Sequence, residues 1–361
     1  QDVTARRDQP PFSASAMDGW AVRAADAPGR LKIVGESAAG RGYDGALKPG
    51  EAVRIFTGAA VPAGADCVVI QEDAQREGHF VSIPAVTEPR NIRATGIDFK
   101  AGDQLLTKGV RLDPWRLSLA AAAGLGALAV SRQPKVAILS TGEEVVEPGG
   151  EPGPFQIFNS GTTALAALVG TWGGSANPLG VVGDDEKSIA RSVAKVGCDL
   201  IVTLGGASVG DHDLVKPALG RLGLELVVES VAVRPGKPTW FGLLGDGRRV
   251  LGLPGNPASA LVCAELFLKP LVGAYQGADH DVHLVTARSA GALPANGQRE
   301  HWMRARLRHA PDGALVAEAF RDQDSSLVSV FASADALLRR SIGASAVSPG
   351  DPVEVLPLAR A

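Results

Sequence analysis

A glycine-rich stretch follows a short apolar run near the middle of the chain, and its residue types suit a bound phosphate. The stretch reads Thr203-Leu-Gly-Gly-Ala-Ser-Val-Gly-Asp-His-Asp213. Glycines allow backbone N–H groups to turn towards one point, and the helix expected after them adds the positive end of its dipole. Asp211 and Asp213 would repel a phosphate unless a divalent cation lay between them. The stretch predicts a phosphate site with Mg²⁺, although glycine turns after strands also occur without a ligand. It is not a Walker loop, because no Gly-Lys-Ser/Thr follows.

Further charged residues follow other strands that the sequence predicts. From residue 134 strands and helices alternate, which predicts a doubly wound, mostly parallel sheet with right-handed crossovers. The expected strands are 136–139, 179–182, 198–204 and 226–233, with a hairpin of 240–244 and 250–253. The expected helices are 162–172, 184–196, 214–222 and one that ends near 271. Open sheets of this kind bind ligands at the carboxyl ends of their strands. The loops after 139, 204 and 233 present Glu144, Asp213 and Lys237 there, with Asp184 at a neighbouring helix start, which suits a metal-bridged phosphate.

The remaining segments predict two β domains and a connector. Residues 1–102 contain β-type runs at 31–34, 52–56, 67–70 and 80–83, which predict an N-terminal β-rich domain with part of the connector. In residues 103–133 Asp113 and Pro114 are typical of a helix start and Gly124 of its end, and 127–130 resumes as a strand, so an α/β connector is expected. Residues 134–272 form the α/β domain. Residues 273–361 return to β runs at 282–286, 302–307, 314–319 and 352–358, with a helical turn at 327–332, which predicts a small β-barrel or sandwich.

Composition excludes several classes of protein. The 361 residues carry a net charge of −3 and no Lys/Arg block, so nucleic acid binding is not expected. Cys67, Cys198 and Cys263 stand far apart in apolar runs and are interpreted as buried thiols. His280 and His283 lack a partnering Cys or Glu motif and are expected to be solvated. No run of about 18 apolar residues and no signal-like segment occurs, so a soluble, cytoplasmic protein without a membrane span is expected.

Taken together, the motifs resemble one known family in their order along the chain. They are Ser15-Ala-Met-Asp-Gly, Thr57-Gly-Ala-Ala-Val-Pro with Gly64-Ala-Asp, Ser140-Thr-Gly-Glu-Glu, Gly205-Gly-Ala-Ser-Val-Gly-Asp, Pro235-Gly-Lys-Pro and Leu253-Pro-Gly-Asn-Pro-Ala-Ser-Ala. The chain resembles the molybdopterin molybdenumtransferases (MoeA family), which include the E domain of gephyrin, over essentially its full length. Taken singly, Asp18 before Gly19 and Thr57 before Gly58 are better explained by turn chemistry, and Arg304 and Ser325 by ordinary polar side chains at the surface.

The resemblance implies a reaction and its participants. Molybdate is inserted into the dithiolene of adenylylated molybdopterin, and AMP is released in a Mg²⁺-dependent step. The α/β domain (MogA-like) would hold the pterin nucleotide, and the partners would be a second copy in a homodimer, the molybdopterin adenylyltransferase, and molybdoenzyme apoproteins or chaperones. The resemblance also implies a helical segment ahead of Gln1.

The resemblance assigns roles to residues by motif. The implied catalytic residues are Asp18, Asp98, Glu144, Asp213 and Lys237, of which Asp18 and Asp98, with Thr57, would come from the second subunit. The implied metal ligands are Glu144, Asp184 and Asp213. The implied binding residues for pterin nucleotide and molybdate are Thr57, Asp184, Gly205, Gly206, Ser208, Gly210, Arg234, Pro254, Pro257, Ser259, Arg304 and Ser325.

The chain departs from the family pattern at a few positions. Arg234 stands where Lys is common, Asn159 and Gly161 where Asp and Asn are usual, and Ser13 and Ala14 where acidic and amide residues are usual. Two other functions are compatible with the same fold: adenylylation of molybdopterin, which the related α/β domain performs alone, and a non-catalytic dimeric scaffold.

Overall fold

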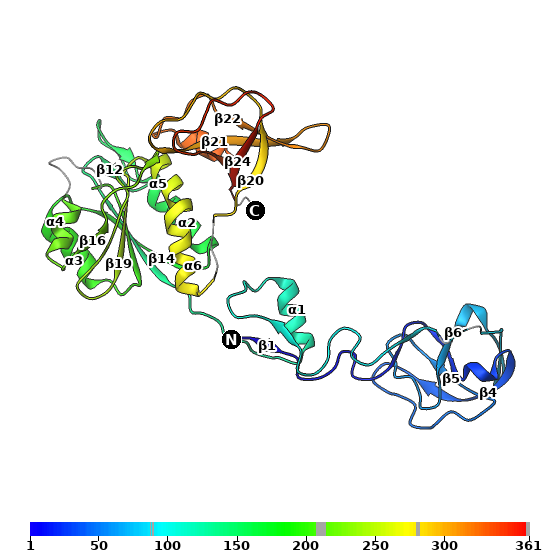
Figure 1. Ribbon diagram of the computed structural model, residues 1–361. Coiled ribbons are helices and arrows are strands. Elements are labelled where there is room, and N and C mark those ends of the chain that lie inside the picture. The colour runs from blue at the N-terminus through cyan, green and yellow to red at the C-terminus, as the bar shows by residue number, and fades with distance from the viewer. Residues whose placement is uncertain (87, 89, 207–213, 279–281, 359–361) are drawn as a thin grey trace. The chain divides into compact units, whose positions relative to one another are not determined.

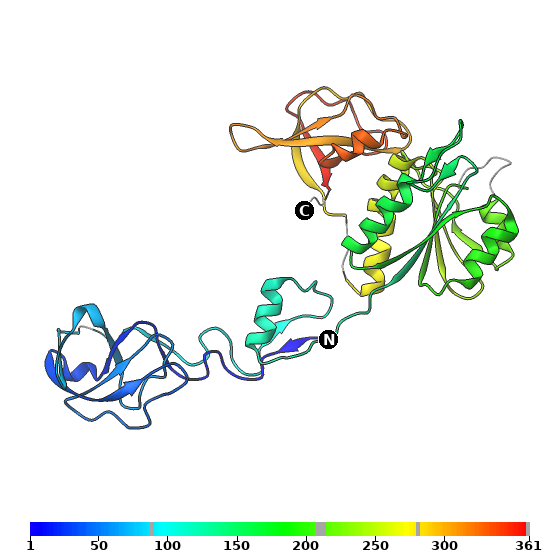
Figure 2. The same cartoon turned by 180° about the vertical axis from the view of Figure 1, so that it is seen from behind.

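The computed structural model describes all residues except 87, 89, 207–213, 279–281 and 359–361. The chain divides into two compact units, residues 1–130 and 131–361. Figure 1 and Figure 2 show each unit from opposite sides. The finer domain boundaries expected near 102, 133 and 272 remain predictions.

The first unit contains a six-stranded β-sheet whose strand order is β6-β3-β5-β4-β8-β7. Its strands are β3 (Gly19–Val22), β4 (Gly29–Ser37), β5 (Glu51–Ile55), β6 (Cys67–Ile70), β7 (Gln75–Glu77) and β8 (Phe80–Ile83). Apolar side chains on both faces of this sheet are buried, with Trp20 and Val81 in one cluster and Val53 and Ile55 in another. The four β-type runs predicted from the sequence in this region lie in β4, β5, β6 and β8. The predicted N-terminal β domain is thus confirmed.

The rest of the first unit is a small α/β element. β1 (Val3–Thr4) pairs antiparallel with β10 (Gln104–Leu106), so the first residues of the chain pack with the connector. Helix α1 (Pro114–Ala122) begins as predicted, because the Asp113 carboxylate accepts a hydrogen bond of 2.8 Å from the Arg116 N–H. The short strands β2 (Ala14–Ser15) and β9 (Ile92–Arg93) pair with each other. The strand predicted over 127–130 is wrong: these residues are irregular and unpaired, and Val130 is 67% exposed.

A mixed six-stranded sheet forms the centre of the second unit. Its order is β14-β11-β15-β19-β18-β16, and β14, β11, β15 and β19 run parallel. The strands are β11 (Lys135–Thr141), β14 (Ser175–Val182), β15 (Leu200–Leu204), β16 (Glu225–Val228), β18 (Trp240–Leu243) and β19 (Arg249–Leu253). The predicted hairpin is β18 and β19, and the predicted doubly wound, mostly parallel domain is confirmed. A separate pair, β12 (Val145–Val146) and β13 (Ile157–Phe158), lies outside this sheet.

One predicted strand of this domain is wrong. The run 226–233 is two short strands in different sheets: β16 pairs with β18 at the sheet edge, and β17 (Val233–Arg234) pairs with the C-terminal sheet. The polar pair Glu229-Ser230 interrupts the apolar run between them. The loop that carries Lys237 therefore does not leave the carboxyl edge of the parallel sheet.

Helices cover both faces of the central sheet (Figure 1). α2 (Ser160–Thr171), α5 (Pro257–Cys263) and α6 (Lys269–Gln276) pack on one face, where Leu165 and Leu268 join the core. α3 (Glu186–Lys195) and α4 (Val215–Gly220) pack on the other face, with Ile189 and Leu219 buried. A π-helical segment, Ala264–Leu268, joins α5 to α6. The continuous run Pro257–Gln276 is long and apolar enough to cross a membrane, but 67% of its window is buried inside the chain, as in a core helix.

The C-terminal strands close into a barrel. The order is β17-β21-β22-β20-β24-β23, and β23 pairs back onto β21, so five strands form a closed ring to which β17 adds. The strands are β20 (Val285–Ser289), β21 (Glu300–His309), β22 (Leu315–Ala319), β23 (Ala336–Arg340) and β24 (Pro352–Pro357). The predicted helical turn is α7 (Val328–Ala332). The β-barrel is confirmed, and β23 is the strand that the sequence reading missed.

Of the three cysteines, Cys67 and Cys263 are buried and Cys198 is partly buried, and all three are free thiols. Burial raises the pKa of the Cys263 thiol to about 12.

Candidate active site

The glycine turn lies where β15 ends at the carboxyl edge of the parallel strands. Gly205 and Gly206 adopt the left-handed backbone conformation, with φ of 85° and 58°. At Gly205 an added Cβ would also lie 2.8 Å from the carbonyl oxygen of Thr141. Both the backbone conformation and this close contact therefore require glycine there. The implied roles of Ser208, Gly210 and Asp213 stay predictions, because these residues lie outside the described part of the chain.

A small cavity of about 60 Å³ adjoins this turn. Glu144, Asn159, Gly205 and Pro257 are among the residues that line it, so the loop with Glu144 meets the glycine turn as predicted, whereas Lys237, predicted at the same rim, does not line this cavity. Asn159 caps α2: its side-chain oxygen accepts from the Thr162 N–H at 3.2 Å, and its amide donates to the Glu147 carboxylate at 3.1 Å. The departure from the family pattern at Asn159 thus keeps a helix cap.

The metal ligands predicted around this cavity are not all found together. Asp184 is exposed, does not line the cavity, and precedes Asp185, whose carboxylate caps α3 through the Ser188 N–H at 2.9 Å. Within the described ranges, no group of three or more His, Cys, Asp or Glu side chains is placed to hold a metal ion. The described residues alone therefore do not build a Mg²⁺ site, and the metal ligand set remains a prediction.

A much larger cavity, of about 730 Å³, lies in the second unit between the α/β domain and the barrel. Four residues predicted for molybdate line it: Arg234, Lys237, Ser259 and Ser325. The structure thus brings together side chains that are up to 91 residues apart in sequence. The wall also contains further charged and polar residues that the sequence reading missed, namely Asn296, Arg299, His301, Arg321, Asp322, Asp324 and Arg340.

The loop that opens α5 is tied to the barrel beside this cavity. The Asn256 amide donates to the Ser325 hydroxyl at 3.2 Å, and the Ala258 N–H donates to the Ser325 carbonyl at 3.2 Å. Pro254 is buried and Pro257 occupies the first helical position, which suits its fixed φ. These contacts hold Ser259 and Ser325 on the same wall.

Arg304 lies behind that wall and does not line the cavity. It is fully buried, and its Nη2 donates to the Asp324 carbonyl at 2.8 Å. Its Nε and Nη1 have no hydrogen-bond partner among the described residues. Burial lowers the pKa of Arg304, while Asp322 and Asp324 oppose that change. Arg304 therefore supports the loop that carries Ser325 and adds positive charge close to the cavity.

Some of the cavity residues that were not predicted follow an alternating pattern that is visible in the sequence, whereas Arg340 does not. Arg299, directly before β21, and His301 and Met303 on that strand occupy alternate positions and all line the cavity, as side chains on one face of a strand do. Arg340 lies on β23, a strand whose run Ala-Leu-Leu-Arg-Arg is too short to be distinguished from a helix by periodicity.

Two residues implied for the opposite side of the cleft meet in the first unit. Asp18 accepts hydrogen bonds from the Thr57 N–H at 2.7 Å and from its hydroxyl at 2.8 Å. These bonds lower the pKa of Asp18, the backbone bond most and the hydroxyl bond next. Asp98 is exposed in the turn after β9, where its N–H donates to the Gln9 carbonyl at 3.0 Å. The proposal that a second subunit supplies all three residues stays a prediction.

Thr57→Val is expected to raise the pKa of Asp18 towards its usual value, because the hydroxyl donor is lost while the backbone donor remains. A lowered pKa stabilises the fold above the usual carboxyl pKa, and this stabilisation is lost as pH falls through the lowered value. The variant should therefore lose part of this pH-dependent stabilisation of the fold. NMR titration of the Asp18 carboxyl carbon measures the shift, and Thr57→Ser, which keeps the hydroxyl, should titrate as wild type. An unchanged pKa in Thr57→Val would show that the hydroxyl bond is not formed in solution.

The second unit thus combines an α/β domain that has a cavity at its strand ends with a β-barrel and a larger cavity lined mostly by basic residues, an arrangement that suits anionic ligands. Family models match in three consecutive segments: the MoeA N-terminal region (domain I and II) at residues 1–124, the probable molybdopterin binding domain at 137–274, and the MoeA C-terminal region (domain IV) at 286–358. The chain belongs to the MoeA family of molybdopterin molybdenumtransferases.

Individual relatives agree with this assignment. The molybdopterin molybdenumtransferase of Nostoc sp. is 35% identical over 99% of this chain and 85% of its own length, and that of Bacillus subtilis is 33% identical over 99% and 86%. A crystal structure of the MoeA molybdopterin biosynthesis protein from Pyrococcus horikosii matches with a TM-score of 0.83 and 32% identity, over 99% of this chain and 90% of that one.

Proposed function

We propose that this chain is a molybdopterin molybdenumtransferase that inserts molybdenum from molybdate into adenylylated molybdopterin, with release of AMP, to form molybdenum cofactor. Full-length relatives carry that name. The observation in this chain that carries the proposal is the cavity of about 730 Å³. Its wall holds five basic side chains, Arg234, Lys237, Arg299, Arg321 and Arg340, against two acidic ones, Asp322 and Asp324.

The charge of this cavity fits a tetrahedral oxyanion. Molybdate carries two negative charges, and fixed Arg and Lys donors bind oxyanions through charge-assisted hydrogen bonds. The hydroxyls of Ser259 and Ser325 add neutral donors on the same wall. The volume lies in the usual range for small-molecule sites and leaves room for the dithiolene that receives the metal.

The residues of the chain bind and position the reactants in this proposal. Lys237 and Arg234 hold the oxyanion, and the glycine turn at Gly205 with Glu144 holds the nucleotide half of the pterin substrate at the strand ends. Binding both reactants in fixed geometry lowers the entropic part of the barrier. Mg²⁺, which the family resemblance implies, would neutralise the nucleotide phosphates.

The proposal also includes an oligomeric state, a cellular location and partner proteins. A homodimer would supply Asp18, Thr57 and Asp98 from the second copy, and the reaction would take place in the cytoplasm. The adenylyltransferase that makes the substrate and the apoproteins or chaperones that accept the product are the expected partners.

The proposal is tested by incubating the protein with adenylylated molybdopterin, Mg²⁺ and molybdate, and by measuring AMP and molybdenum-loaded pterin together. Equal amounts of both products are expected, and omission of molybdate should abolish the loaded pterin. Glu144→Gln should slow AMP release, whereas Glu225→Gln, on the exposed strand β16, should not. Wild-type protein that releases no AMP and loads no molybdenum would overturn the proposal.

A further inference from the structure

Two arginines and a histidine occupy paired positions on neighbouring strands at the large cavity. His301 of β21 is the direct partner of Arg234 on β17 and of Arg340 on β23. Residues directly opposite one another in neighbouring strands project from the same face of a sheet, and all three residues line the cavity. A row of Arg234, His301 and Arg340 therefore faces the space in which the oxyanion is proposed to bind.

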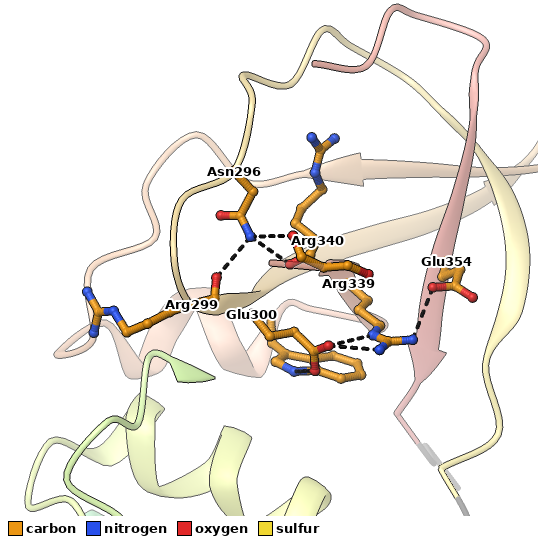
Figure 3. Close-up of polar contacts among 8 residues, drawn as sticks. Asn296, Arg299, Glu300, Arg339, Arg340 and Glu354 are labelled. Atoms are coloured by element: carbon orange, nitrogen blue, oxygen red, sulfur yellow. Dashed lines mark hydrogen bonds and ion pairs between the residues drawn. The ribbon is translucent and has the colours of Figure 1, made fainter. Parts of the chain in front are cut away.

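Of the two adjacent arginines of β23, only Arg339 is paired with a carboxylate among the residues that the structure describes. Arg339 forms ion pairs with Glu300 at 2.8 Å and Glu354 at 3.2 Å, and its side chain points away from that of Arg340 (Figure 3). The Arg340 side chain is 4% exposed, and its Nη2 donates to the carbonyl oxygens of Pro294 and Ser345. Its Nη1 has no hydrogen-bond partner among the described residues. Arg340 thus adds a buried positive charge to the cavity wall.

One side chain bridges the backbone segments that flank His301 and carry Arg340. The Asn296 amide nitrogen donates to the carbonyl oxygens of Arg299 at 2.9 Å, Arg340 at 2.8 Å and Ser341 at 2.8 Å (Figure 3). These bonds therefore join the residue before β21 to the end of β23.

Four arginines act on His301, in a cavity wall that also contains two aspartates. Burial first, and then Arg234, Arg304, Arg299 and Arg340, lower the pKa of His301 to about 4, so the imidazole is neutral at pH 7. The other charged groups of the cavity wall come from two further segments: Lys237 from the turn after β17, and Arg321, Asp322 and Asp324 from the loop after β22. A dianion among these groups would cancel much of the positive field at the imidazole, which favours its protonated form.

We infer that His301 is an additional anion-binding residue of this cavity, and that it takes up a proton when the oxyanion binds. The protonated ring adds a positive charge and an N–H donor beside those of Arg234 and Arg340. Because the two binding events are linked, protons strengthen oxyanion binding by the same factor by which the oxyanion strengthens protonation. The inference rests on the proposed oxyanion site and adds to it the residue that couples the site to pH.

The test is calorimetric titration of the full chain with sulfate, which stays a dianion over the pH range used, and with molybdate at neutral pH. Titrations at pH 6 in two buffers of different ionisation enthalpy give the number of protons taken up. If the bound form restores an ordinary histidine pKa, wild type takes up about half a proton or more at pH 6, and sulfate affinity rises about tenfold from pH 7.5 to 5.5.

Two variants separate His301 from other titrating groups. His301→Gln keeps an uncharged donor and should bind sulfate with little proton uptake and a nearly flat pH profile. His309→Gln, at the exposed far end of the same strand, should behave as wild type. NMR of the His301 ring should show its pKa rising when sulfate is added, which does not depend on any variant.

The outcomes distinguish the inference from the function on which it rests. If neither sulfate nor molybdate binds to wild type, the oxyanion site itself is wrong. If they bind without proton uptake, or if His301→Gln takes up as many protons as wild type, the role of His301 is overturned while the proposed function stands.

Discussion

Lys237→Met is expected to lower kcat/KM for molybdate by about 10²–10³, because it removes a positive charge that holds the oxyanion while the reaction proceeds. Lys237 lies on the turn between Pro235 and Pro238 and lines the large cavity. Two backbone hydrogen bonds fix this turn, from Val231 N–H to Lys237 O at 3.1 Å and from Thr239 N–H to Gly236 O at 3.0 Å. Methionine keeps much of the aliphatic length, so the turn should survive.

Lys237→Met should impair the use of molybdate but not the binding of the pterin substrate. The affinity for adenylylated molybdopterin, measured by calorimetry, should change little, because the nucleotide is proposed to bind at the Gly205 turn. Lys195→Met, at the exposed end of α3, removes a lysine charge from the same unit and should leave kcat/KM within about twofold of wild type. Equal losses in the two variants would mean that net charge, and not the position of Lys237, determines the rate.

Gly236→Ala is expected to cost about 2–4 kcal/mol of folding free energy and to weaken molybdate binding at the same time. Gly236 has φ of 127°, which side chains rarely adopt, and an added Cβ would lie 2.2 Å from the Cys263 sulfur. Cys263 is fully buried in α5 and accepts from the Thr239 hydroxyl at 3.1 Å. The new methyl group must therefore push the turn that carries Lys237 away from α5.

Denaturant unfolding and molybdate titration measure the two effects. Gly297 offers a matched control in the same cavity wall, since a Cβ added there meets no described atom within 4 Å, and Gly297→Ala should change stability by less than about 1 kcal/mol. Adding Cys263→Ala to Gly236→Ala should recover part of the loss, because the collision is relieved while the backbone strain stays. A stable Gly236→Ala protein with normal molybdate affinity would contradict the close packing described here.

Local signals in the sequence were sufficient for most elements. Asp113, Pro114 and Gly124 define α1 because capping depends on neighbouring residues alone. The strand that precedes Gly205 is predictable because a run covered on both faces is apolar throughout. The wrong predictions concern elements whose structure depends on contacts with residues far away in the sequence. β17 pairs with β21, more than sixty residues later. The polar pair Glu229-Ser230 indicates a break within 226–233, but it does not indicate that the end of the run joins a different sheet.

The candidate site divides in the same way, into residues that the sequence predicts and residues that only the fold brings together. Arg234, Lys237, Ser259 and Ser325 were found through motif resemblance, and the structure places all four on one cavity. His301 and Arg340 belong to no such motif, and their roles depend on strand pairing that only the fold provides. Arg304 was expected to contact the oxyanion, but its contacts place it behind the wall that carries Ser325.

The most direct test of the central claim is anomalous diffraction from crystals soaked in tungstate, a heavy tetrahedral analogue of molybdate. The account predicts an anomalous peak inside the large cavity, within hydrogen-bonding distance of Lys237 Nζ and of the Ser259 or Ser325 hydroxyl, which is lost in Lys237→Met crystals. A strong peak elsewhere on the chain, with this cavity empty in crystals of active protein, would contradict it.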